Sequence, residues 1–116
     1  PPVAAAPSSS SSVQKVVDDL QEQEQRLMAE AASLEAQEQS VHGKRSVVSS
    51  TLLAQRNQML MKNAPDQEVE TLNEQISSVM QKINQASAQI EVNKRSVGSK
   101  LDLVRRQLRN AVRMLQ

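Results

Sequence analysis

A seven-residue repeat of apolar side chains runs without interruption through the second half of the chain and constrains its fold more than any other feature. The repeat consists of Val69, Ile76, Ile83, Ile90, Val97, Val104 and Ala111. Three positions after each of these comes a companion row of Leu72, Val79, Ala86, Asn93, Lys100, Gln107 and Met114. Seven-residue spacing of this length winds α-helices around each other with a left-handed twist. The second half is therefore predicted to be one helix of a coiled coil.

The first half of the chain carries a matching pair of rows. One row is Val13, Leu20, Leu27, Leu34, Val41 and Val48, and the row four positions later is Val17, Glu24, Ala31, Glu38, Arg45, Leu52 and Met59. In an antiparallel pair, facing residues have numbers with a constant sum, and a sum of 131 brings the rows of both halves together. It pairs Val48 with Ile83, Val41 with Ile90 and Leu20 with Ala111. The midpoint of this register lies between Pro65 and Asp66.

A strong helix breaker lies at the same point. Asn63 tolerates the left-handed conformation that ends a helix, Pro65 cannot continue it, and Asp66 suits the start of another helix. We predict one helix over about 12–62, a turn at 63–66 and a second helix over about 66–116. The expected fold is all-α, a long antiparallel two-helix coiled-coil hairpin over 12–116, to which partner helices could be added to make a bundle.

The charge distribution favours the same antiparallel pairing. Residues 18–38 carry seven acidic residues against one Arg, whereas the facing residues 93–113 carry seven basic residues against one Asp. Nearer the turn the signs are reversed, because 39–62 is basic and 63–92 is acidic. A parallel homodimer would place like charges beside each other. Two chains that open at Pro65 and exchange halves would make the same contacts as the hairpin, so a swapped dimer remains an alternative.

Composition excludes several classes of protein. The chain has no Phe, Tyr, Trp or Cys and only one His, so a disulfide framework or a thiolate metal site cannot form. No glycine-rich phosphate loop occurs, and the carboxylates lie along helix faces where nothing excludes water. We therefore expect no enzyme activity, catalytic residue, cofactor or metal site. A net charge of +1 and the lack of aromatic side chains for base stacking argue against nucleic-acid binding.

The beginning of the chain differs from the rest in composition. Residues 1–11 are rich in Pro, Ala and Ser, and we expect a flexible tail or linker there. This start without Met suits the mature end of a processed, organellar protein as well as an interdomain linker, and it leaves the compartment open. No apolar run approaches the roughly 18–20 residues that span a bilayer, so a soluble or peripheral protein is expected.

Two features predict partner binding. The apolar stripe near the end of the chain is wider than one partner helix requires. Its expected outward contacts are Leu101, Leu108, Val112 and Leu115, with Arg105 and Arg109 interleaved. We call the line of contact between the two predicted helices the seam. Some of its positions are polar, and they either fix the register or leave room for further helices: Glu24, Glu38, Arg45, Asn93 and Lys100.

The sequence thus predicts a structural or scaffolding coiled-coil subunit that binds protein helices, from another copy or from other subunits of an assembly. A rigid arm or tether of a larger protein, such as a stalk or translocator, is one alternative. A helix pair lying on an anionic membrane surface through its basic stripe is another, although no Trp or Phe is present to anchor it.

Overall fold

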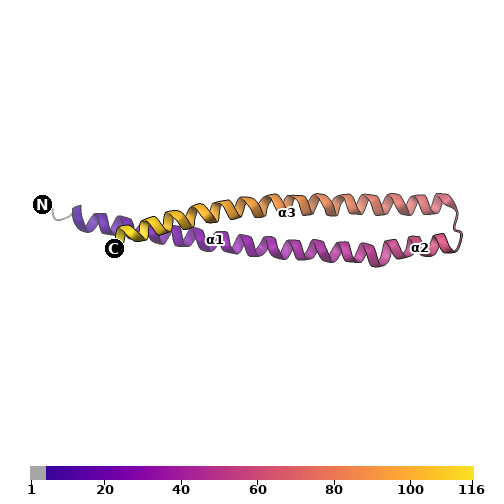
Figure 1. Cartoon of the computed structure of the whole chain (residues 1–116), viewed down its shortest axis with the longest axis horizontal. Helices are drawn as coiled ribbons and strands as arrows, with labels where there is room; N and C mark the ends of the chain where they lie inside the picture. The colour runs from indigo at the N-terminus through magenta and orange to yellow at the C-terminus, as the bar shows by residue number, and fades with distance from the viewer. Residues whose placement is uncertain (1–4) are drawn as a thin grey trace. The chain divides into compact units, whose positions relative to one another are not determined.

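The computed structural model of the chain describes residues 5–116, with side chains from residue 11 onwards. The elements in chain order are helix α1 (Ala5–Val48), the π-helical segment η2 (Ser49–Leu53), helix α2 (Ala54–Met61) and helix α3 (Asp66–Leu115) (Figure 1). The described residues contain no β-strand. The predicted all-α antiparallel hairpin with a turn near Pro65 is confirmed.

Helix α1 begins at Ala5, seven positions before the start expected from the sequence. Alanine is the best helix former, and Pro7 falls in the first turn, where a backbone N–H would have no intrahelical partner. The Pro/Ala/Ser segment therefore lacks a residue that must stop a helix. The remainder of the expected tail, residues 1–4, lies outside the described residues.

The turn between α2 and α3 is closed by backbone hydrogen bonds. The Asn63 N–H donates to the carbonyl of Leu60 at 3.2 Å, and the Ala64 N–H donates to the carbonyl of Met59 at 2.9 Å. Asn63 has a φ of 54°, the left-handed conformation expected from the sequence. This pair of bonds is a Schellman motif, which satisfies carbonyls at the end of a helix. The carbonyl of Pro65 then accepts the first bonds of α3, so Asp66 stands in the first turn rather than at the N-cap.

The helix before the turn is interrupted at η2. The hydroxyls of Ser50 and Thr51 both donate to the carbonyl of Val47, at 3.3 and 2.6 Å. Such side-chain bonds compete with the backbone ladder, and a π segment holds one more residue per turn than an α-helix. Because of this extra residue, the position seven after Val48, Gln55, is exposed and Arg56 is half-buried in its place.

The chain divides into two compact units, each of which contains part of α1 and part of α3. In the unit of residues 34–92, Val41, Val48, Ile83 and Ile90 form a buried cluster. Leu52, Val79 and Met80 pack against this cluster. The pairs Val48–Ile83 and Val41–Ile90, which the register sum of 131 predicts, thus belong to one core.

The other unit combines residues 1–33 with 93–116. Among its described residues, Val17, Leu20, Val104 and Ala111 form a buried cluster against which Leu27 and Leu108 pack. The pair Leu20–Ala111 again follows the predicted register. The companion row of α3 does not, because Lys100, Gln107 and Met114 are exposed.

Candidate helix-docking grooves

The structure corrects the expected orientation of Leu101 and Leu108. Leu101 is 9% exposed, and Leu108 packs against the cluster of Val17, Leu20, Val104 and Ala111, so both leucines lie in the seam. They lie four positions after Val97 and Val104, and on a helix both the third and the fourth following residues flank the same stripe. Burying leucine is favourable, whereas burying an unpaired lysine is costly. The leucines therefore displace Lys100 and Gln107 from the seam.

The other expected contacts remain at the surface. Val112 and Leu115 are exposed near the end of α3. Arg109 is exposed as well, and it lines a shallow cleft with Asp102, Arg105 and Arg106. This part of α3 is therefore a basic, partly apolar face, although narrower in apolar surface than the sequence predicted.

Polar side chains expected in the seam make contacts across the two helices. The Arg105 Nε lies 3.0 Å from Glu24 Oε2, and the two side chains are 46% and 21% exposed. The Arg45 Nη2 donates to Asn84 Oδ1 at 3.2 Å. Glu38 and Asn93 are half-buried, whereas Lys100 is exposed and lies outside the seam.

A third cross-helix contact joins Arg56 and Asn73, with Arg56 Nη1 donating to Asn73 Oδ1 at 3.3 Å. In this contact, and in the Arg45–Asn84 and Glu24–Arg105 contacts, the two residue numbers add up to 129. The sum for the polar contacts thus differs by two from the sum of 131 that describes the apolar pairs. They flank the apolar pairs and support the same antiparallel alignment.

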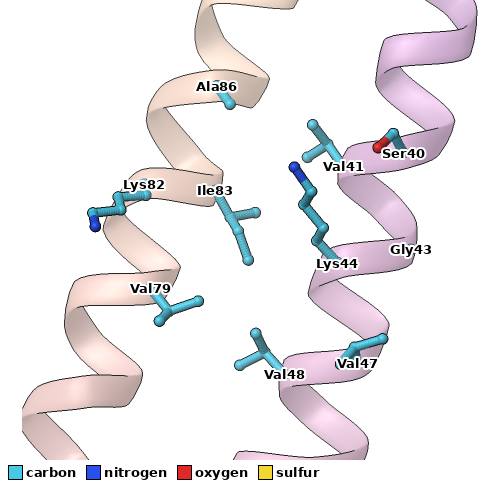
Figure 2. Close-up of a pocket in the computed structure, with 10 residues that line it drawn as sticks. All are labelled: Ser40, Val41, Gly43, Lys44, Val47, Val48, Val79, Lys82, Ile83 and Ala86. Atoms are coloured by element: carbon cyan, nitrogen blue, oxygen red, sulfur yellow. The ribbon is translucent and has the colours of Figure 1, made fainter.

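One flank of the seam in the unit of residues 34–92 is open as a groove of about 700 Å³ (Figure 2). Its lining includes Lys44, Val47 and Val48 of α1, and Val79, Lys82, Ile83 and Ala86 of α3. We call it the valine groove. Val47 is 58% exposed although it adjoins the buried Val48. Figure 2 shows Lys44 extending from α1 towards Ile83 and Ala86, while Lys82 extends away from α1.

A second groove, of about 350 Å³, lies within the other unit. It is lined by Gln23, Arg26 and Leu27 of α1, and by Lys100, Leu103, Val104 and Gln107 of α3. We call it the leucine groove, after Leu103, which is 51% exposed. Arg26 also forms an ion pair with Glu22 at 3.1 Å.

The two grooves occupy equivalent positions of the seven-residue repeat. Each lining residue of the leucine groove lies 21 positions, or three heptads, from a lining residue of the valine groove: Gln23 from Lys44, Leu27 from Val48, and Val104 from Ile83. Both linings combine apolar side chains with two cationic ones and contain no acidic residue. The same combination thus recurs in each unit, built from different side chains.

Val47, Lys44 and Lys82 were not predicted as site residues, because the sequence signals for partner binding lay in the polar seam positions and at the end of α3. A usable signal was present. Val47 directly precedes a seam valine, and in a two-helix coiled coil a residue at that position belongs to the flank. An apolar side chain at that position is not buried by the predicted helix pair alone. The valine at position 47 could therefore have indicated the groove.

Comparison with known proteins adds no family: the chain matches no protein-family model, no curated protein and no solved structure. Within residues 5–116, no helix combines the length and apolarity needed to cross a bilayer. The described part of the chain also lacks a group of three or more His, Cys, Asp or Glu residues that could hold a metal ion.

Proposed function

We propose that this chain is a non-enzymatic structural subunit whose hairpin binds helices of partner proteins within a larger assembly. The observation that supports the proposal most directly is the valine groove. There an exposed valine, Val47, continues the apolar surface of the buried Val41, Val48 and Ile83 out to solvent.

A helix is the partner that fits this surface. The groove lies between two helices, and an amphipathic helix presents apolar side chains at the spacing that such a groove accepts. In a pair of helices only one stripe of each helix is buried. A third helix on the flank covers further apolar surface of both. Binding would thus add a layer to the seam and needs no chemical reaction at the site.

The test uses the whole chain and a neutral peptide of about 21 residues, with leucines at the seam positions of three heptads and glutamines at the flanking positions. We expect saturable binding, measured by fluorescence anisotropy, with a gain of peptide helicity. Val47→Gln should weaken binding about tenfold, because burial of a valine contributes about 1.5 kcal/mol.

Val92→Gln is the matched control. Val92 is 55% exposed, close to the exposure of Val47, and does not line the valine groove. This variant should bind the peptide as the unchanged chain does. Absence of peptide binding, or equal weakening by the two substitutions, would contradict the proposal.

A further inference from the structure

The charges around the valine groove restrict what can occupy it. Lys44 and Lys82 line the groove from opposite helices, and its lining has no acidic residue. Neither lysine forms an ion pair within the described residues. This contrasts with Arg105, whose charge is already matched by Glu24 at 3.0 Å. The groove therefore presents two unmatched cations beside an apolar floor.

From this arrangement we infer that the occupant of the valine groove is an amphipathic helix of a different protein, with acidic residues on both sides of its apolar stripe. The inference rests on the proposed function and specifies its partner. Complementary charges at the rim of an interface speed association and exclude wrong partners, while the apolar stripe supplies the affinity.

A second copy of the chain fits the groove poorly. Two copies that met groove to groove would bring the lysines of one close to the lysines of the other, which is repulsive. The chain does have acidic helical segments, 18–38 and 66–74, but Met28 is the one exposed large apolar side chain in these two described segments. Leu20, Leu34 and Leu72 are buried, and Leu27 packs against the cluster of Val17, Leu20, Val104 and Ala111. Those segments could enter a groove only after the hairpin had opened.

Gly43 leaves space for the close approach of a helix. It lines the valine groove inside α1, five residues before this helix ends at Val48, and glycine within a helix costs about 1 kcal/mol relative to alanine. A Cβ atom added at Gly43 would meet nothing within 4 Å, so packing within the chain does not require the glycine. The missing side chain leaves room for a partner backbone at the edge of the groove.

The decisive experiment compares three peptides that share the leucine stripe of the neutral probe and differ only at the flanking positions, which are all Glu, all Gln or all Lys. The chain has no cysteine, so Ser40→Cys allows an environment-sensitive dye to be attached at the valine groove alone. The same dye on Ser46→Cys, which lies outside the lining, is the control for binding elsewhere.

We expect the dye at residue 40 to report binding in the order Glu, Gln, Lys, with at least a tenfold difference in affinity between the Glu and Lys peptides. Raising the salt concentration from about 0.05 to 0.5 M should narrow this difference, because exposed charges are screened. The double variant Lys44→Glu/Lys82→Glu should reverse the order of the Glu and Lys peptides. Lys15→Glu/Lys62→Glu makes the same change of charge outside the groove and should leave the order intact.

The outcomes separate the two proposals. Equal binding of all three peptides at residue 40 would overturn the acidic partner and leave helix binding standing, whereas no binding of any peptide would overturn both. Two further results would also overturn the acidic-helix inference. One is a concentration-dependent dimer, seen by light scattering, that Val47→Gln abolishes. The other is binding to vesicles of anionic phospholipid that depends on Lys44 and Lys82 while the Glu peptide does not bind.

Discussion

The two units of the chain follow the same seven-residue repeat in α3. They differ in whether the third or the fourth residue after each repeat position is buried beside it. In the unit of residues 34–92, the residue three positions after Val69, Leu72, is buried, and the next residue, Asn73, is exposed. In the other unit the order is reversed, because Leu101 is buried and Lys100 is exposed. The seven-residue spacing thus determines the central stripe, whereas the position that completes the seam beside it changes from the third to the fourth following residue along α3.

The change takes place within α3 itself. Val79 and Met80 occupy the two competing positions, and both pack against the cluster of Val41, Val48, Ile83 and Ile90. An α-helix has 3.6 residues per turn and a seven-residue repeat assumes 3.5, so the helix drifts steadily relative to the repeat. A helix as long as α3 can therefore pass from one companion row to the other without a break.

The largest expected effects on stability test which of the two adjacent residues is buried in each unit. Leu72→Ala and Leu101→Ala should each lower the free energy of unfolding by about 2–3 kcal/mol, because each removes a buried leucine. Asn73→Ala and Lys100→Ala should change it by about 0.5 kcal/mol or less. Urea unfolding followed by helicity gives all four values. A larger loss for Lys100→Ala than for Leu101→Ala would show that both units use the same row.

A smaller effect is expected at the two glycines, one in each unit. Gly43→Ala and Gly98→Ala should each raise the free energy of unfolding by about 1 kcal/mol, because alanine favours the helix and a Cβ atom meets nothing within 4 Å at either site. Thermal unfolding of the two variants measures the gain. Destabilisation by either substitution would mean that the glycine is needed for the fold of its own unit.

The smallest effect is expected for the polar contacts of the two units. A double-mutant cycle on Glu24 and Arg105, with Gln at each position, should give a coupling of about 0.5 kcal/mol that decreases in salt, since both side chains are partly exposed. The same cycle on Arg45 and Asn84, with Ala at each position, should depend less on salt because Asn84 carries no charge. Equal salt dependence of the two couplings would contradict this distinction.

The hairpin, its turn and its register could be predicted from the sequence because each depends on a strong, local or periodic signal. The row through Ile83 and Ile90 and the breaker at Pro65 are of this kind. The choice between Lys100 and Leu101 could not be predicted from the repeat alone, since it requires weighing the burial of two adjacent side chains against each other. The expected outward orientation of Leu101 and Leu108 was wrong for this reason.

The candidate site was harder to predict than the fold. The valine groove depends on which flank of the seam is left uncovered, and Val47 and Lys44 become conspicuous only when their exposure is known. The π-helical segment was not predicted either, because Ser and Thr also occur in regular helices, and the bonds of the Ser50 and Thr51 hydroxyls to one carbonyl become evident only in the structure. The proposed binding of partner helices stays a prediction.

The π-helical segment Ser49–Leu53 also bears on how tolerant the chain is to changes in its length. A deletion in a regular coiled-coil helix rotates everything beyond it by about 100°, so the following seam residues leave the interface. Loss of one residue from a π segment instead restores a regular helical turn. Sequences that differ in length by one residue at this point can therefore share the same turn at Asn63 and the same pairing beyond it.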